Sequence, residues 1–134
     1  MQPPDRGQES PSGTRKPGAM ESKTKRTLVK SAPELWELAD DLNRMEVWMG
    51  GLIGARNPIA VEVVYRDPGR VLAWRSAEPR AHARIALELG ASGFGTAVAI
   101  TAQHTRPDPR DAIAALEGLL DELGSPERRP FVAG

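Results

Sequence analysis

The 134-residue sequence contains no cysteine, which excludes disulfide bonds, thiol catalysis and cysteine-ligated zinc. This composition fits a reducing compartment, and we expect a cytoplasmic protein. No run of about 18 apolar residues occurs, so no membrane-spanning helix and no integral membrane association are expected. The N-terminus also lacks the apolar stretch that a signal peptide needs.

Aromatic residues are few, at three Trp, one Tyr and two Phe, so the core must rest on Leu, Val, Ile and Ala. The formal net charge is zero, which argues against a dedicated nucleic-acid-binding protein, where a basic surplus is usual. Arg outnumbers Lys by 14 to 4. Together with abundant Ala, this suggests a GC-rich coding genome and a bacterial source.

The composition divides the chain into three parts. Residues 1–24 are rich in Pro, Gly, Ser and charge and are expected to be a disordered tail. Removing them should therefore leave thermal stability nearly unchanged, and Met20 offers a second plausible translation start. Residues 25–124 carry the apolar periodicity of one folded domain. Residues 125–134 are a C-terminal extension.

Local signals predict a strand over residues 25–30 and two helices after it. Ser31 is placed to act as an N-cap, and Glu34, three residues later, completes a capping box. Residues 42–48 should form a second, shorter helix that glycines between residues 50 and 54 end. The first helix has an apolar face with the spacing i, i+3, i+4 and i+7, which consists of Leu35, Leu38, Ala39 and Leu42.

Beyond Ile59 the apolar period changes to two, which predicts four strands joined by tight turns and hence an antiparallel sheet. The first alternates Val61, Val63 and Tyr65 with other residues. It ends in the turn at residues 67–70 (DPGR), where Pro presets φ and Gly accepts a positive φ. Residues 71–75 return as its partner strand.

The third of these strands has the clearest alternation, because one face carries Ala83, Ile85, Leu87 and Leu89. Residues 90–95 (GASGFG) are expected to form a hairpin loop. Residues 96–104 are the last strand, with Val98 and Ile100 pointing inward.

A long C-terminal helix is predicted from Asp108, a candidate N-cap, to Gly124, which fits the position after the helix end. About 15 residues span roughly 22 Å, which is enough to cross a small sheet. Its apolar face consists of Ile113, Leu116, Leu119, Leu120 and Leu123. The fold class is therefore α+β, a helix-grip arrangement in which a curved antiparallel sheet of about five strands wraps on this helix.

Several strings resemble the SRPBCC superfamily, the START-like group that includes polyketide cyclase/dehydrase-like proteins. They are residues 29–38 (VKSAPELWEL), 40–48, 71–74 (VLAW) and 95–100 (GTAVAI), and the resemblance covers residues 26–123. It implies a helix-grip fold with a cavity between sheet and C-terminal helix. The interval between Trp48 and Ile59 is short, however, so a strand pair that the family commonly has is shortened or missing.

The resemblance implies an apolar small-molecule ligand, such as a lipid or a polyketide-like compound, and no cofactor. The residues expected to line its cavity are Trp48, Trp74, Ile85, Leu87, Ile113, Leu116 and Leu120. The alternative is that these side chains simply fill the core. Two other functions stay open: an enzyme of the cyclase, aromatase or dehydratase type, and a protein-interaction module with a filled core.

No catalytic residue is assigned, because no spacing supplies a histidine with a second group at hydrogen-bond reach. His82 and His104 are interpreted as ordinary surface histidines, and without cysteine they make a poor metal site. Asp40 and Arg44 have the i, i+4 spacing of a surface ion pair. The arginines of the first hairpin are interpreted as solvated, namely Arg66, Arg70 and Arg75.

Overall fold

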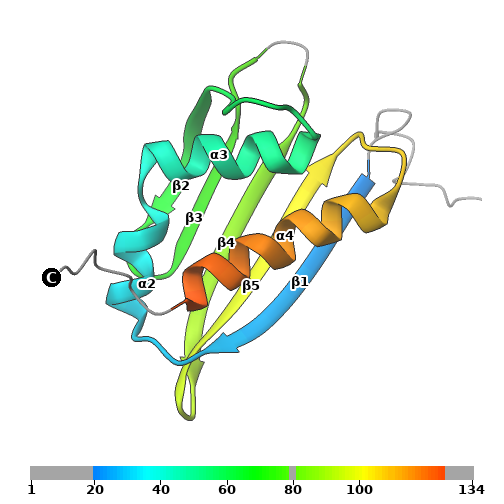
Figure 1. Cartoon of the computed structure of the whole chain (residues 1–134). Coiled ribbons are helices and arrows are strands. Elements are labelled where there is room, and N and C mark those ends of the chain that lie inside the picture. The colour runs from blue at the N-terminus through cyan, green and yellow to red at the C-terminus, as the bar shows by residue number, and fades with distance from the viewer. Residues whose placement is uncertain (1–19, 79–80, 126–134) are drawn as a thin grey trace, which may run out of the picture.

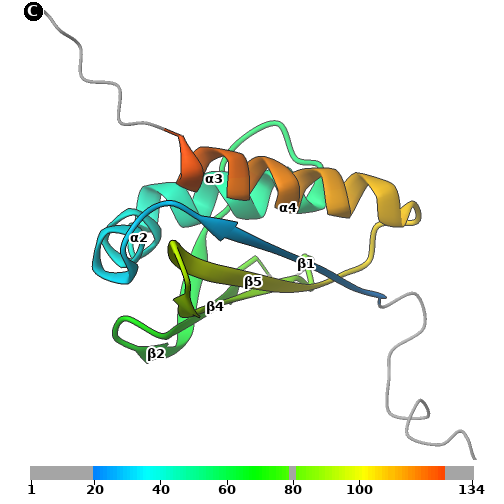
Figure 2. The same cartoon turned by 90° about the horizontal axis from the view of Figure 1, so that it is seen from below.

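The computed structural model describes residues 20–78 and 81–125. Within them an antiparallel five-stranded sheet has the strand order β1-β5-β4-β3-β2. In this described part of the chain, three helices lie on one face of the sheet and none lies on the opposite face (Figures 1 and 2). In chain order the elements are β1 (Met20–Leu28), α2 (Ala32–Ala39), α3 (Leu42–Ile53), β2 (Val61–Asp67), β3 (Val71–Ser76), β4 (Arg84–Ser92), β5 (Gly95–His104) and α4 (Pro109–Gly124).

The first strand is longer than predicted. It begins at Met20, which pairs with His104, and runs antiparallel to β5 along its whole length. Residues 20–24 therefore belong to the sheet, and the prediction that they are part of a disordered tail is wrong. The error arose because the segment is polar, and its pairing with a distant strand leaves no local signal. Residues 1–19 and 126–134 lie outside the described residues.

The two short helices begin as predicted. The side chain of Ser31 accepts a hydrogen bond from the backbone N–H of Glu34, and the side chain of Asp41 does the same for Arg44. The predicted end of the second helix at Trp48 is wrong, because α3 continues through Gly50 and Gly51. It stops at Gly54, whose φ of 78° is the left-handed conformation that favours glycine.

The first hairpin contains a β-bulge that the alternating pattern did not predict. The turn is as expected, with Gly69 at φ 80° and Arg70 N–H donating to the carbonyl of Asp67. The register of β2 shifts between Val63 and Tyr65, so Tyr65 turns to the open face and is 54% exposed. The strict alternation predicted for this strand is therefore broken, because the bulge inserts an extra residue.

The hairpin between β4 and β5 is tighter than predicted. Both strands extend into the segment expected to be a loop, and Ser92 pairs with Gly95. On the helix-covered face, β4 buries Ile85, Leu87 and Leu89, and Ala83 just before it is buried too, as predicted, while β5 buries Val98 and Ile100.

The C-terminal helix α4 covers the sheet along β1 and β5 (Figure 1). Asp108 caps it through its carboxylate, which accepts from the backbone N–H of Arg110, and the helix ends at Gly124, one residue later than expected. Its fully buried side chains are Ala112, Leu116, Leu119, Leu120 and Leu123, while Ile113 is half-buried. The helix-grip fold predicted from the sequence is confirmed.

A deletion experiment tests the extended first strand. Removing residues 1–24 takes away buried Ser22 and Thr24, whose hydroxyl donates to Glu117 on α4 at 2.8 Å. We expect the melting temperature to fall by about 5 °C or more relative to a chain lacking residues 1–19. Equal melting temperatures for the two deletions would show that residues 20–24 contribute nothing to the sheet.

Candidate functional site

The seven residues predicted to line a cavity lie together between the sheet and the helices, but they are packed. Six of them are buried, with Trp48 the most exposed at 7%, and Ile113 is half-buried. Described residues also form solvent-open depressions, for example beside Arg84, beside Val71 and beside Ser31, and none of the seven lines these three. The lining role of these residues stays a prediction.

Two tryptophans meet at the centre of this region. The rings of Trp48, on α3, and Trp74, on β3, lie 6.2 Å apart between centroids and are tilted by 38°. The indole N–H of Trp48 donates to the carboxylate of Glu122 on α4 at 3.0 Å. This bond ties α3 to α4 over the sheet, and it was not predicted because it joins residues far apart in the sequence.

Trp74 has a buried polar atom without a partner. Its side chain is fully buried, and its Nε1 is the one buried side-chain nitrogen or oxygen among the described residues that makes no hydrogen bond. An N–H group left unsatisfied in a protein interior costs about 1–3 kcal/mol. Buried groups of this kind are nearly always paired, so the unpaired N–H of Trp74 is an exception.

His104 is not the surface histidine that the sequence indicated. It is 1% exposed, because β5 pairs with strands on both sides and its inward face is covered. Its Nδ1 accepts the backbone N–H of Arg106 at 3.2 Å, and its Nε2 lies 2.9 Å from the hydroxyl of Ser22. These contacts assign a neutral ring that carries its proton on Nε2 and donates it to Ser22. Burial, and after it the charge of Arg106, lowers the pKa of His104.

The predicted ion pair between Asp40 and Arg44 does not form. Asp40 ends α2 and binds the guanidinium of Arg66 at 2.9 Å instead. Arg44 turns back toward the carbonyl of Leu38. The two residues lie on either side of a break between helices, so the i, i+4 geometry of a continuous helix is absent.

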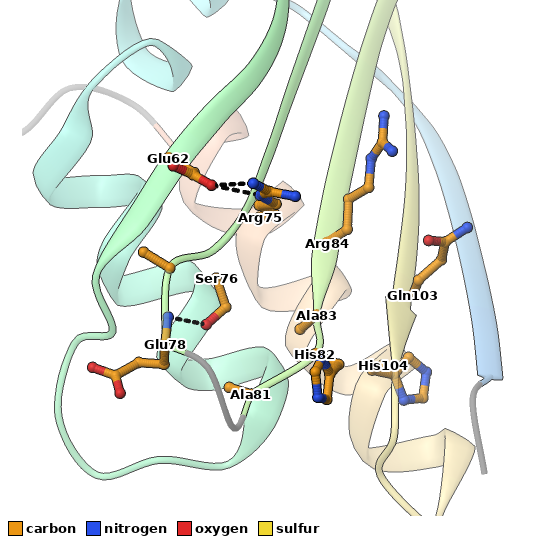
Figure 3. Close-up of a pocket in the computed structure, with 11 residues that line it drawn as sticks. Glu62, Arg75, Ser76, Glu78, Ala81, His82, Ala83, Arg84, Gln103 and His104 are labelled. Atoms are coloured by element: carbon orange, nitrogen blue, oxygen red, sulfur yellow. Dashed lines mark hydrogen bonds and ion pairs between the residues drawn. The ribbon is translucent and has the colours of Figure 1, made fainter. Parts of the chain in front are cut away.

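The other hairpin arginines also have carboxylate partners. Arg70 pairs with Asp67, and Arg75 donates to Glu62 at 2.6 Å across the first hairpin. His82 is exposed, as predicted, and lines a depression of about 470 Å³ at the end of the sheet where β3 and β4 are joined (Figure 3).

The described residues contain no group of three or more His, Asp or Glu side chains placed to hold a metal ion. Nor does any helix among them have the length and apolarity to cross a membrane.

Comparison with solved structures places this architecture in the helix-grip class, the fold of SRPBCC-type proteins. An AHSA1-like protein from Aeromonas hydrophila aligns with a TM-score of 0.61 at 11% identity, over 78% of this chain and 90% of that one. The Aha1 dimer from Colwellia psychrerythraea gives 0.56 at 14% identity, over 78% and 96%. CalU16 from Micromonospora echinospora gives 0.52 at 18% identity, over 82% and 80%.

No family model matches the sequence, and no curated protein does. At these low identities the solved structures show the fold and leave the function to the residues of this chain.

The packing around α4 can be tested by cavity creation. Leu120 is fully buried and Leu116 is 1% exposed, so replacing either with Ala should lower the free energy of unfolding by about 2–5 kcal/mol. Half-buried Ile113, on the same helix, is the matched control, and Ile113→Ala should cost clearly less in urea unfolding. If Leu116→Ala and Leu120→Ala both lower the free energy of unfolding by less than Ile113→Ala does, a cavity is already present beneath the helix.

Acid should destabilise the fold through His104. The unfolded chain binds a proton near the ordinary histidine pKa of 6.5, whereas the native ring, with its lowered pKa, stays neutral. The free energy of unfolding should therefore fall as the pH drops below 6.5, until the pH passes the native value. Urea unfolding at a series of pH values measures this effect. The acid-induced decrease in the free energy of unfolding should be smaller in His104→Gln than in wild type and unchanged in His82→Gln.

The helix cap does not interfere with this measurement. A side-chain hydrogen bond from Arg110 lowers the pKa of Asp108 below its ordinary 3.8, so its contribution is lost only in stronger acid. An unchanged slope between pH 7 and 5 in His104→Gln would contradict the assignment of a buried neutral ring.

Proposed function

We propose that this protein binds a small, mainly apolar molecule that carries one hydrogen-bond acceptor, between the sheet and α4. The observation that carries the proposal is the unpaired indole N–H of Trp74 in a fully buried position. An acceptor on the ligand, such as a carbonyl oxygen, would satisfy this donor.

The surroundings of Trp74 support such a ligand. Its neighbours across the sheet are Val63 on β2 and Ile85 on β4, and both pack in or against the apolar core. A mostly apolar wall with a single well-placed polar group is the usual composition of a small-molecule site. The apolar wall orients the ligand only weakly, and the hydrogen bond from the indole N–H fixes which end of the ligand points toward Trp74.

Entry of a ligand requires side chains to move, because this region is packed in the unliganded chain. Trp48 is the natural gate, since it contacts Trp74, is 7% exposed, and is held through a hydrogen bond to the exposed carboxylate of Glu122. Displacing one indole frees room for about one ring system. The ligand we propose is therefore small, comparable to an aromatic ketone and much smaller than a sterol.

The residues of this chain favour binding over catalysis. The buried polar or charged side chains among the described residues are Ser22, Thr96 and His104, and of these only the histidine titrates near neutral pH. Both of its ring nitrogens are engaged, by Ser22 and by Arg106. We therefore propose no reaction.

An interaction module is the second candidate, and a specific observation favours it. The core is packed, and edge strand β2 exposes Val64 and Tyr65, at 38% and 54%. One of the similar folds is described as a dimer. Exposed apolar side chains next to one another are a common feature of protein contact surfaces.

A matched pair of probes distinguishes these functions. Acetophenone and ethylbenzene have nearly the same shape, but only acetophenone carries a carbonyl acceptor. We expect acetophenone to bind about 2- to 10-fold more tightly, the effect of one hydrogen bond. Binding is followed through the amide spectrum of the full chain.

The variant Trp74→Phe should abolish this preference and keep binding of ethylbenzene, while Trp36→Phe, at a partly exposed tryptophan, should retain the preference. Binding of neither probe, or the same preference in wild type and Trp74→Phe, would overturn the proposed site. If the chain binds neither probe, the interaction module becomes the better-supported function.

A further inference from the structure

The open face of the sheet carries a row of polar side chains that runs across four strands. In the antiparallel register Glu62 faces Arg75, Arg75 faces Arg84, and Arg84 faces Gln103. Their neighbours Trp74, Ile85 and Ala102 are buried on the helix side, so strand alternation places this row on the opposite face. Figure 3 shows the four side chains side by side along the depression.

Two arginines face one another directly in this row. Residues in register on adjacent antiparallel strands have Cβ atoms about 4.5–5.5 Å apart, and like charges there are destabilising. Glu62 neutralises Arg75 through a 2.6 Å hydrogen bond from its Nε. Within residues 20–78 and 81–125, no carboxylate forms an ion pair with Arg84.

The remaining acidic groups near the row do not neutralise Arg84. Glu78 lines the same depression but lies away from Arg84 in Figure 3. Glu21, which follows Gln103 in the row, lies 3.9 Å from Lys23 and pairs with it. One guanidinium therefore faces the solvent with a second guanidinium on one side and an amide donor on the other.

We infer that this depression is a binding site for the carboxylate of a small organic acid. The fork of Arg84 matches a carboxylate in two parallel hydrogen bonds, and the amide of Gln103 supplies a third donor. One uncompensated positive charge fits a single negative charge better than a phosphate dianion. The depression holds about 470 Å³, the size of a small-molecule site rather than a macromolecular surface.

The floor of the depression suits a short apolar tail on the acid. Ala77, Ala81 and Ala83 line it together with the polar row, and the rings of His82 and His104 line it as well. The depression lies at the end of the sheet and is not lined by Trp74 or by any other residue predicted to line the cavity beneath α4, so it is separate from the site at Trp74.

The test uses sodium butyrate as the probe and the amide spectrum of the full chain as the readout. We expect saturable shifts at Arg75, Arg84 and Gln103, reached within tens of millimolar. Butyramide, which has the same shape without the charge, and sodium chloride at equal ionic strength should not produce them. Arg84→Gln should weaken butyrate binding at least about 10-fold, the effect of losing a hydrogen bond to a charged group.

Two variants complete the design. Arg70→Gln removes an exposed arginine at the other end of β3 and should leave butyrate binding unchanged. Arg84→Lys keeps the charge without the fork and should bind with intermediate affinity. The site is overturned if Arg84→Gln binds butyrate as tightly as wild type, if sodium chloride produces the same shifts, or if no saturable shift occurs. Shifts at Trp74 in place of these residues would also overturn it.

Discussion

The apolar face of the five-stranded sheet has to be removed from water, and the packing of α4 against it does most of this. The leucines of α4 are buried in the apolar core, where the helix lies along β1 and β5, and each contributes about 1.5–3 kcal/mol when fully buried. The helix-covered face can hold a ligand only by moving packed side chains, while the other face stays open to solvent.

Polar contacts at the margins hold the cover in place. Arg26 on β1 bridges two carboxylates of α4, with hydrogen bonds of 2.6 Å to Glu117 and to Asp121. At the other end, Arg106 donates to the carbonyls of Gly51 and Leu52 at the end of α3 and pairs with Asp111 in the first turn of α4. Arg106 thus satisfies helix carbonyls that lack intrahelical partners and joins both helices to β5.

The buried polar side chains of the described residues differ in whether they have a hydrogen-bond partner. His104 and Thr96 are buried and hydrogen-bonded. The histidine ring forms hydrogen bonds with Ser22 and Arg106, and the threonine hydroxyl donates to the carbonyl of Lys30. Trp74 is buried and unpaired, which is why the proposed ligand site is placed there. On the open face, Arg84 has no ion-pair partner among the described residues, and it faces another arginine in register.

The sequence by itself determined the features that local chemistry controls. The caps at Ser31 and Asp108, the turn at Asp67 and the alternation of β4 each depend on residues a few positions apart, and all are present in the structure. The inward positions of Ile85 and Leu120 followed from the same periodicity, and that of Trp74 was implied by the family resemblance. The C-terminal helix over the sheet could also be predicted, because its predicted length was enough to cross a small sheet.

Only the tertiary structure decided what depends on partners distant in the chain. The polar segment at residues 20–24 is a strand because β5 offers it a free edge, and His104 is buried because strands lie on both sides of it. Asp40 binds Arg66 rather than Arg44 because a helix ends between the two expected partners. The unpaired N–H of Trp74 and the facing arginines of β3 and β4 arise in the same way: register and packing, which no local pattern encodes, set which groups meet and which are left without a partner.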